Sequence, residues 1–486
     1  MSNGEEDQLV AKCICIHCIG ELFLKDEVKR LGKRKKCSYC NRIAKAYTLE
    51  IMAGRLDDAL QQFYVRTPNE PDSWAYYRQK ELGEIWDRDG YPIVDVIEEA
   101  AAIPRIAAED IQELLNDKYS DFESDQIGIE TEYSSESNYS LKNHDDKYWR
   151  RQWEAFSRSV RKDSRIFNDA AKKILESIFE GISELTTLGR RSVIVDGGPG
   201  TDVQEIYRAR TFTSIHALRE ALSSPDQQLG PPSTKYATSG RMNSRGISVF
   251  YGASEPSVAI SEVRPPVGSK VVVAAFEVIR PIKLLDLEML TAITASGSIF
   301  DKSELGRRER HAFLRTLTRL LTLPVMPGEE ELEYIPTQAV ADFLAQMGAP
   351  HIDGIRFSSV QSDAKGSNYV LFHKSSFVEP LPKAKDSQLE VRLGYYDDEV
   401  YIHYTINEKK KVLAEVPPKL EQNLPFDVAS YATQQVPAHY TLRIRKNSIK
   451  VHEVKAASFS TDDNDVLWIE TDDNNKLSEQ STFGSR

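Results

Sequence analysis

One short stretch, GRMNSRGISVFYGASEPSVAISEVRPP at residues 240–266, places a tyrosine and a glutamate eleven residues apart between turn-forming residues. A strand ending at Tyr251 would carry the ring to one wall of a cleft. A short helix stopped by Pro265 and Pro266 would project Glu262 from its last turn. An aromatic face can stack on a planar heterocycle, and a carboxylate can stabilise positive charge on a sugar carbon. The stretch therefore predicts a ligand held between two side chains.

Further polar side chains of residues 190–382 fall in this stretch or at the ends of strand-like segments. They are Arg208, Arg241, Asn243, Ser359 and Asn368. A guanidinium can grip a pyrophosphate through two parallel hydrogen bonds. Together with an aromatic ring and a carboxylate, such a set suits cleavage of an N-glycosidic bond in a dinucleotide. Nicotinamide in NAD⁺ is already a cationic leaving group, so this reaction needs no general acid.

Motifs of several other reaction classes are missing from the sequence. It contains no G-x-S-x-G, H-E-x-x-H or Walker sequence, and the turn GGPGTD lacks the G-K-[ST] ending of a phosphate loop. The histidines of this region have no partner at a triad or ligand spacing; they are His216, His311, His351 and His373. Triad hydrolysis and metal-assisted chemistry are therefore disfavoured here.

Each candidate residue also has a purely structural interpretation. Arg208 can be an ion-pair partner at a strand edge, Tyr251 a half-buried strand residue and Ser359 a turn former. Glu262 can pair with Arg264 at a helix end, although the C-terminus of a helix is the unfavourable end for a carboxylate. The joint occurrence of these residues favours the functional interpretation.

All five cysteines lie in the first 40 residues, and such clustering in a cytosolic chain indicates a metal site rather than disulfides. The pattern is C-x2-C, eighteen residues and C-x2-C, formed by Cys15, Cys18, Cys37 and Cys40. Four thiolates complete a closed tetrahedral shell, which suits structural Zn²⁺. Cys13 is left over, and His17 remains an alternative ligand inside the first pair.

The run KRLGKRKK, residues 29–36, lies between the cysteine pairs and could touch phosphates. However, the chain of 486 residues has a net charge of −12, which disfavours a general nucleic-acid or anionic-membrane binder. We therefore interpret the run as a solvated loop that eases thiolate charge. No apolar run is long enough for a membrane span and the N-terminus lacks a signal-peptide core, so we expect a cytoplasmic protein.

The chain is long enough for several domains, and changes in composition and residue pattern divide it into four regions. Residues 1–186 predict a zinc knuckle and a helical domain, with helices near 46–65, 92–102, 108–117, 146–162 and 166–185 and an aperiodic segment at 119–146. A helical-domain ribonuclease would need an arginine and a histidine a few residues apart on one helix, and this region has no such pair.

Residues 190–382 predict a mixed α+β domain. In it, we expect Ser254 to cap the helix that carries Glu262, a helix near 301–322, and another capped by Thr337 and closed by Gly348. After a linker at 380–387, residues 388–460 alternate in places and predict a small β domain or a β extension. Residues 461–486 predict an acidic disordered tail. The fold class is therefore α+β.

Several motifs in the expected order resemble the RES domain. They are EIYRARTF, the stretch quoted above, DGIRFSS and NYVLF, and they span about residues 190–375. The cysteine pairs and the helices after them are similar to the zinc-containing, HEPN-like domain that precedes some RES domains. The resemblance implies a fold like that of ADP-ribosyltransferase toxins, with Arg208, Tyr251, Glu262 and Ser359 as the catalytic set. Arg210 and Ser358 are the alternative registers for the arginine and the serine.

The resemblance also implies an activity and partners. RES proteins degrade NAD⁺ by phosphorolysis or hydrolysis, and many act as toxins of toxin–antitoxin pairs or in antiphage defence. NAD⁺, inorganic phosphate and an antitoxin or regulatory protein are therefore the expected partners, and homo-oligomerisation stays open. The large N-terminal region and the C-terminal extension depart from compact RES toxins. An ADP-ribosyltransferase acting on a macromolecule and a catalytically inactive, zinc-containing interaction module remain alternatives.

Overall fold

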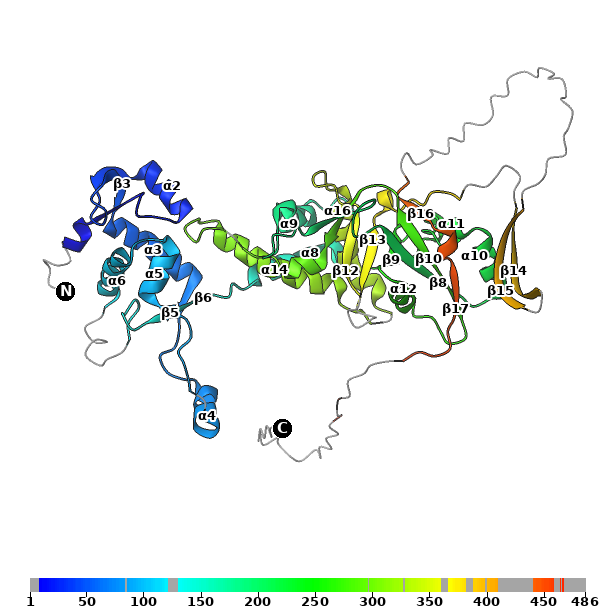
Figure 1. The fold of residues 1–486 in the computed structure, drawn as a ribbon, viewed down its shortest axis with the longest axis horizontal. Coiled ribbons are helices and arrows are strands. Elements are labelled where there is room, and N and C mark those ends of the chain that lie inside the picture. The colour runs from blue at the N-terminus through cyan, green and yellow to red at the C-terminus, as the bar shows by residue number, and fades with distance from the viewer. Residues whose placement is uncertain are drawn as a thin grey trace, which may run out of the picture.

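The computed structural model describes residues 8–83, 85–120, 130–295, 297–326, 328–359, 366–381, 388–397, 400–409 and 440–458, with residues 464 and 466. Nearly all of the expected acidic tail and most of the expected linker lie outside these ranges. Figure 1 shows a largely helical N-terminal unit at one end of an elongated molecule and a large sheet with flanking helices at the other. The α+β class expected from the sequence is confirmed.

The N-terminal unit begins with a small sheet that carries the cysteines. Its elements, with two adjoining helices, are β1 (Cys13–Cys15), α2 (Leu22–Leu31), β2 (Lys33–Lys36), β3 (Ile43–Thr48) and α3 (Leu49–Phe63). The strand order is β1-β3-β2, so β2 is an edge strand. The loop expected at 29–36 is therefore wrong, since this run ends a helix and forms a strand. Helix α3 buries all its periodic apolar residues, and Thr48 caps it by accepting from the backbone of Ile51.

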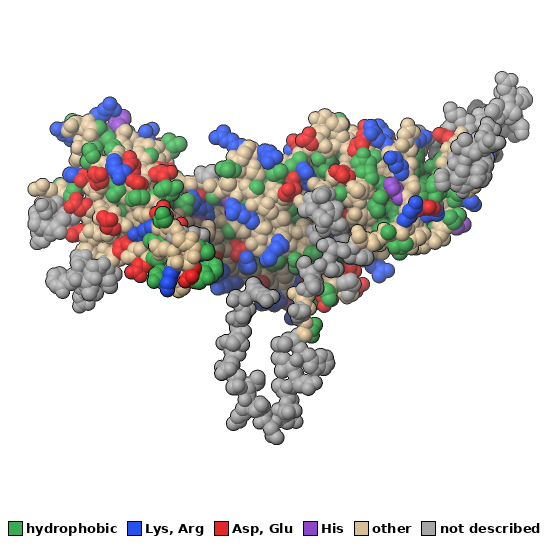
Figure 2. All heavy atoms as spheres, turned by 60° about the horizontal axis from the view of Figure 1, so that its bottom comes forward, with side chains coloured by type: hydrophobic (Ala, Val, Ile, Leu, Met, Phe, Trp, Pro, Cys, Tyr) green, Lys and Arg blue, Asp and Glu red, His purple; other side chains and the backbone are tan. Residues whose placement is uncertain are grey.

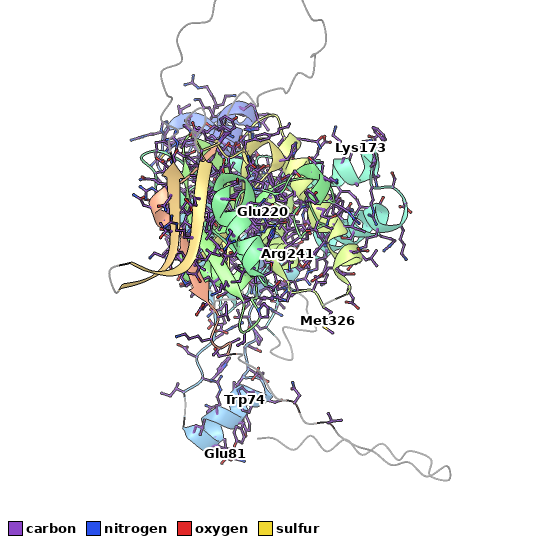
Figure 3. The ribbon with its side chains drawn as sticks, turned by 90° about the vertical axis from the view of Figure 1, so that its right-hand side faces the viewer. Trp74, Glu81, Lys173, Glu220, Arg241 and Met326 are labelled. Atoms are coloured by element: carbon purple, nitrogen blue, oxygen red, sulfur yellow. The ribbon has the colours of Figure 1, made fainter. Side chains whose placement is uncertain are left out.

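Further helices and a second small sheet complete this unit. The elements are β4 (Tyr64–Arg66), α4 (Ser73–Leu82), β5 (Tyr91–Pro92), α5 (Ile93–Ala101), α6 (Arg105–Tyr119) and β6 (Asn138–Leu141). The apolar faces of α3, α5 and α6 form one core. In the segment expected at 119–146 as a loop or extended excursion, residues 121–129 lie outside the described ranges, and residues 138–141 form β6, which pairs with both β4 and β5. Helix α4 buries none of its side chains, and Figure 3 shows its Trp74 and Glu81 well away from the main body.

The next two helices pack with the second unit. They are α8 (Lys147–Lys162) and α9 (Asp169–Ile178). Phe156, Val160 and Leu175 share a core with helices that lie far later in the sequence, and not with α3, α5 and α6. The helix expected over 166–185 is shorter, because Asn168 caps its start and a single 3₁₀ turn follows Gly181. The packing thus divides the cores between β6 and α8, earlier than the boundary expected at residue 186.

In the part of the chain that the structure describes, nine strands form the sheet of the second unit, in the order β16-β10-β8-β9-β13-β12-β11-β7 with β17 beside β10. The strands are β7 (Ile194–Gly197), β8 (Glu205–Phe212), β9 (Phe250–Ala253), β10 (Lys270–Val278), β11 (Ile282–Asp286), β12 (Gly354–Ser358), β13 (Ser367–Leu371), β16 (Leu442–Ile444) and β17 (Lys450–Glu453). Strand β8 pairs with β10 over its whole length but meets β9 only where Tyr207 lies opposite Ala253. The sheet therefore opens between β8 and β9.

Helices cover this sheet and define the opening. They are α10 (Ile215–Ser223), α11 (Pro225–Gln228), α12 (Pro256–Glu262), α13 (Leu287–Thr291), α14 (Glu304–Thr322), α15 (Glu330–Glu333) and α16 (Ile335–Gln346). Helix α14 links the two units. Phe300, just before it, lies in the N-terminal core and accepts a hydrogen bond from Arg55 at 2.9 Å, whereas Thr322 at its other end reaches the sheet opening.

Two expected helix caps are wrong. Ser254 does not cap α12, because its hydroxyl accepts a hydrogen bond from the backbone of Ser367 and so ties β9 to β13. Thr337 lies inside the first turn of α16 and donates to the carbonyls of Tyr334 and Arg241. Helix α16 also ends at Gln346, before Gly348.

The C-terminal strands extend the same architecture. Strands β14 (Gln388–Asp397) and β15 (Val400–Lys409) form a hairpin that contacts α10. Strands β16 and β17 pair with β10, so this part of the expected C-terminal β region is an extension of the large sheet. No helix within the described ranges is both long enough and apolar enough to span a bilayer.

Candidate active site

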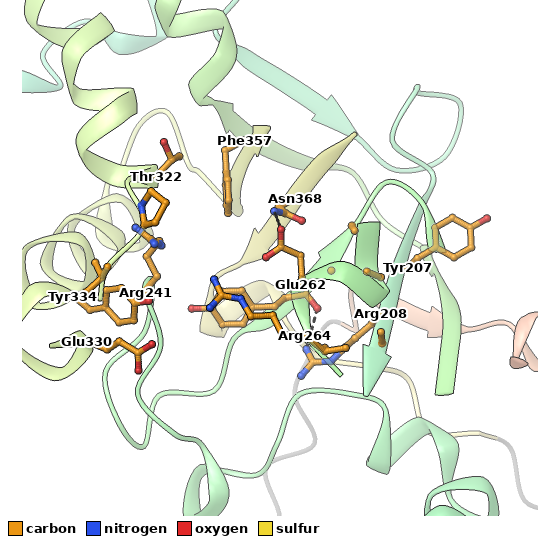
Figure 4. Close-up of a pocket in the computed structure, with 18 residues that line it drawn as sticks. Tyr207, Arg208, Arg241, Glu262, Arg264, Thr322, Glu330, Tyr334, Phe357 and Asn368 are labelled. Carbon is orange, nitrogen blue, oxygen red and sulfur yellow. Dashed lines mark hydrogen bonds between the residues drawn. The ribbon is translucent and has the colours of Figure 1, made fainter. Parts of the chain in front are cut away.

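A cavity of about 470 Å³ lies where the sheet opens between β8 and β9 (Figure 4). Helix α12, the C-terminal end of α14, and α15 with Tyr334 directly after it close its sides. The side chains with polar or aromatic groups on its wall are Tyr207, Arg208, Arg241, Tyr251, Glu262, Arg264, Thr322, Glu330, Tyr334, Phe357 and Asn368. Five residues expected from the sequence thus converge on one cavity: Arg208, Arg241, Tyr251, Glu262 and Asn368.

Arg208 bridges the opening of the sheet. It leaves β8 next to the only pairing with β9, donates to the carbonyl of Tyr251 at 3.3 Å, and lies 5.0 Å from the centre of the Phe250 ring. Burial lowers the pKa of Arg208 to about 10, and Arg210 adds to the effect, so the group stays cationic at neutral pH. No carboxylate in the described part of the chain pairs with this half-buried cation. An anionic ligand would supply the missing charge.

Tyr251 forms a rigid wall of the cavity. Its hydroxyl donates to Oδ1 of Asn243 at 2.9 Å and accepts from the backbone of Met242 at 3.0 Å. Burial raises the pKa of Tyr251 to about 12, so the phenol is neutral at physiological pH. Because both hydrogen-bonding functions are occupied and the proton is firmly held, the ring is suited to contact a ligand and not to act as a base.

Glu262 is an exposed carboxylate on the last turn of α12, where the helix stops before the double proline as expected. Its Oε1 accepts two hydrogen bonds of 2.7 Å, from Oγ of Ser359 and from Nδ2 of Asn368. Its Oε2 has no bonding partner among the residues that the structure describes. The Oδ1 of Asn368 is likewise buried without a partner in that part of the chain. The carboxylate is thus fixed through one oxygen and free at the other.

Cationic and aromatic groups on the opposite wall were not all found from the sequence. Arg241 donates to the carbonyl of Leu323 at 2.7 Å, at the end of α14, and lies 5.0 Å from the centre of the Tyr334 ring. Phe357 and Arg264 complete this side, and Arg264 has an unusual positive φ of 42°. Phe357 lies inside the motif DGIRFSS, so the sequence around it could have indicated that it belongs to the site. Tyr334 had no local signal, since only the tertiary fold brings it there.

Four other expected site residues lie outside the cavity wall. The side-chain amide of Asn243 donates hydrogen bonds to backbone carbonyls of its own loop, and its Oδ1 accepts from Tyr251 and so positions that ring. Arg210 binds the carbonyl of Gln228, one register beyond Arg208. Ser358 donates to Glu288 at 3.1 Å, whereas Ser359 is fully buried behind Glu262. The geometry therefore separates groups that can touch a ligand from groups that position them.

The four paired cysteines form a second candidate site in the N-terminal unit. All four sulfur atoms lie within 4.8 Å of one another, with 3.5 Å between Cys15 and Cys40 and 3.7 Å between Cys18 and Cys37. Thiolates bound tetrahedrally at about 2.3 Å from one ion would lie about 3.8 Å apart, so the donor set fits such a metal. Burial raises the pKa of Cys15 and Cys18 in the absence of a cation. Cys13 points to the carbonyl of Ala11 and takes no part.

Two protein-family models match the chain, one mainly in each of the two units. A model of the RES domain matches residues 205–392, which include every element around the cavity. The chain therefore carries a RES domain. A second model, HEPN/RES N-terminal domain 1, matches residues 30–174 and therefore continues past β6 into α8 and α9. Among proteins with curated descriptions, none matches this chain.

Proposed function

We propose that this RES protein cleaves the nicotinamide–ribose bond of NAD⁺, with the cavity between β8 and β9 as its active site. The observation that carries the proposal is the convergence of incomplete polar groups on one cavity. Arg208 lacks a carboxylate partner, one oxygen of Glu262 is free, and Oδ1 of Asn368 is buried without a partner within the described ranges. A dinucleotide offers phosphates for the cation and a ribose for the carboxylate and amide.

In the proposed reaction, Arg208 binds the pyrophosphate and Tyr251 contacts the nicotinamide ribose end of the substrate. The C–N bond breaks with its electron pair moving to the pyridinium nitrogen, which neutralises the leaving nicotinamide. The free oxygen of Glu262 stabilises the positive charge that develops on the sugar carbon. Water or inorganic phosphate then adds through oxygen to that carbon; water releases a proton in this step. Ser359 and Asn368 hold Glu262 in place during the charge change.

The direct test is incubation of the purified chain with NAD⁺, with and without inorganic phosphate, and identification of the products by mass spectrometry. We expect free nicotinamide together with ADP-ribose in phosphate-free buffer, or a phosphorylated ADP-ribose that requires added phosphate. Transfer of the ADP-ribose mass to a protein or nucleic acid would instead indicate a transferase. Intact NAD⁺ under all conditions would contradict the proposal.

We further propose that cleavage depletes cellular NAD⁺, as in a toxin or antiphage effector. Expression in a bacterial host should then lower the NAD⁺ pool and arrest growth unless a partner protein restrains the enzyme. The measurement is the NAD⁺ content per cell before growth stops. A growth arrest with an unchanged NAD⁺ pool would separate toxicity from this activity.

For the cysteine cluster we propose one structural Zn²⁺ held by Cys15, Cys18, Cys37 and Cys40. A closed set of four sulfur ligands leaves no coordination position for a substrate, and the site lies in a different unit from the cavity. Substitution Cys18→Ser should remove stoichiometric zinc and make the N-terminal unit sensitive to protease, because metal binding and folding are coupled in such knuckles. Cys13→Ser is the matched control and should keep the metal. Purified protein without stoichiometric zinc would contradict the assignment.

A further inference from the structure

The strongest unexplained feature outside the cavity is a concentration of positive charge on the N-terminal sheet. Residues 28–45 contain eight lysine and arginine residues and no aspartate or glutamate, in a chain whose net charge is −12. All four residues of strand β2, Lys33, Arg34, Lys35 and Lys36, are exposed. Figure 2 shows Lys and Arg side chains along the outline of the N-terminal end of the molecule. The charge is therefore local, and it is displayed on the surface.

The structure places these cations along one edge. Within the described ranges, β2 pairs only with β3, from Lys33 opposite Ala46 to Lys36 opposite Ile43, and no other described strand pairs with its second edge. Lys29 and Arg30 lie in the last turn of α2, immediately before this strand. None of these six cations forms an ion pair with a carboxylate in the described part of the chain. The result is a continuous strip of six positive charges that lack a carboxylate partner among the described residues.

Two ordinary structural explanations do not account for the strip. Compensation of a zinc site with four thiolates requires only about two positive charges, whereas the segment supplies eight. A charged edge strand prevents edge-to-edge aggregation, but one or two lysines are enough for that purpose. The C-terminus of α2 favours Lys29 and Arg30 by its dipole, yet the dipole does not explain four further cations on β2.

We propose that β2 and the end of α2 bind the phosphate backbone of a nucleic acid. Successive side chains of an extended strand point to opposite faces, so the four cations of β2 can flank a polyanion that runs along the open edge. An anionic membrane surface fits less well. Binding to membrane by an amphipathic helix requires a continuous, free apolar face, whereas Leu24 and Val28 of α2 are buried in the core. The exposed apolar side chains of α2, Leu22, Phe23 and Leu31, lie only at its two ends. The exposed charged side chains of Asp26, Lys29 and Arg30 lie between them and interrupt any apolar face. Contacts of this kind are independent of sequence.

The N-terminal unit then has a function separate from the cavity. Strand β2 and the cavity lie in different units of the elongated molecule, joined by α14 (Figure 1). The inference does not depend on the proposed cleavage of NAD⁺, because it uses none of the residues of the cavity. It reverses the interpretation of residues 29–36 as a charge-compensating loop, and the acidic remainder of the chain explains why overall composition gave no signal.

The test is a binding measurement with the full chain, using a fluorescent single-stranded RNA, a duplex DNA and vesicles rich in an anionic phospholipid. Four phosphate contacts, one for each cation of β2, predict that the affinity for the duplex falls about 150-fold between about 50 and 200 mM salt, and that for the single strand about 50-fold. The two nucleic-acid arms identify the preferred form. Binding to vesicles without binding to either nucleic acid, or no salt-dependent binding at all, would overturn the proposal.

A charge-matched pair of variants locates the contact. The substitution of Lys33, Arg34, Lys35 and Lys36 by Gln should weaken binding at least 10-fold and reduce the slope of log affinity against log salt by about three to four. The control replaces four exposed cations elsewhere, Lys162, Lys173, Arg219 and Lys374, by Gln. It has the same net charge and should bind nearly as the wild type. An equal loss in both variants would show that only net charge matters.

Folding of the variants is checked by their zinc content and by the resistance of the N-terminal unit to limited proteolysis, which should both match the wild type. If the fourfold variant of β2 loses zinc because Lys36 adjoins Cys37, the double variant Lys33→Gln with Lys35→Gln replaces it. The double variant changes one face of the strand only and should reduce the salt slope by about two. An unchanged slope in this folded variant would remove β2 from the interface.

Discussion

Both units bury polar groups, but they satisfy them differently. In the N-terminal unit, the carboxylate of Asp57 is 4% exposed and accepts hydrogen bonds from Lys118, Tyr119 and Tyr133 at 2.6–2.9 Å. In the RES unit, Arg208 has no carboxylate partner, and Glu262 uses one oxygen within the described chain. A network that satisfies itself contributes to stability, whereas one that leaves partners missing is arranged for a ligand.

The largest effect that would separate the two kinds of network is the loss of charge at Glu262. Substitution Glu262→Gln keeps the size of the side chain and an oxygen for Ser359 and Asn368, but it removes the negative charge that we propose acts on the sugar of NAD⁺. Turnover of NAD⁺ should fall by about two to four orders of magnitude while NAD⁺ still binds. Steady-state kinetics and calorimetry measure the two properties.

The control for this change is Glu255→Gln at the other end of the same helix. Glu255 is exposed and does not line the cavity, so its variant should turn over NAD⁺ at the wild-type rate. A folded Glu262→Gln protein that cleaves NAD⁺ as fast as the wild type would remove the carboxylate from the mechanism.

The next effect concerns the geometry of the guanidinium. Substitution Arg208→Lys keeps the positive charge, but one ammonium cannot make the paired hydrogen bonds of a guanidinium to a phosphate. Affinity for NAD⁺ should fall about 10- to 100-fold, the range expected for hydrogen bonds to a charged group. Arg210→Lys, two residues along β8, is the matched control, because Arg210 binds Gln228 outside the cavity. A loss in the Arg210 variant alone would shift the register of the family arginine.

Disruption of the hydrogen-bond network around Asp57 should lower the free energy of unfolding of the N-terminal unit. Substitution Asp57→Asn should destabilise the N-terminal unit by roughly 2 kcal/mol, because a neutral amide replaces a buried acceptor of several hydrogen bonds. The exposed neighbour Asp58 provides the control Asp58→Asn, which should change stability by less than about 0.5 kcal/mol. Denaturant unfolding followed by limited proteolysis of the N-terminal unit measures both. If Asp57→Asn left the free energy of unfolding unchanged, the network would contribute little to stability.

The same network predicts a pH dependence. Burial raises the pKa of Asp57, but hydrogen bonds from Lys118, Tyr133 and Tyr119 outweigh burial and hold the pKa below its usual value. A carboxyl group with a lower pKa in the folded state stabilises that state above its unfolded pKa of about 4. This stabilisation is lost as pH falls through the folded pKa. The acid destabilisation of the N-terminal unit should therefore be weaker in Asp57→Asn.

The sequence predicted the elements of the candidate active site better than their surroundings. A strand that carries Tyr251 and the helix stop after Glu262 could be found from residues 240–266, because they follow from local turn and proline chemistry. The expected end of that strand at Tyr251 is wrong, since β9 continues to Ala253, where it pairs with β13 and β8. The helix caps expected at Ser254 and Thr337 failed because a hydroxyl can bind a distant backbone group as well as a local one. Tyr334 and the end of α14 reach the cavity only through tertiary packing. Strand β2 was missed because it pairs through its backbone, which four cationic side chains do not reveal.

The smallest predicted effect is a change in stability on substitution of Arg208. It should be opposite in sign to that of Asp57→Asn, and it compares the two units directly. Arg208 is a half-buried cation without a carboxylate partner in the described chain, so its desolvation costs free energy in the absence of a ligand. Replacing it by a methionine of similar length removes that cost, although it also removes the hydrogen bond to Tyr251 and the contact with Phe250. Arg208→Met should therefore leave the stability of the ligand-free RES unit unchanged or raise it by about 1 kcal/mol, while NAD⁺ binding is lost. Thermal unfolding with and without NAD⁺ measures both, and NAD⁺ should raise the melting temperature of the wild type only. If Arg208→Met instead destabilised the ligand-free protein by as much as Asp57→Asn, Arg208 would be part of a structural network like that of Asp57, and the contrast between the two units would disappear.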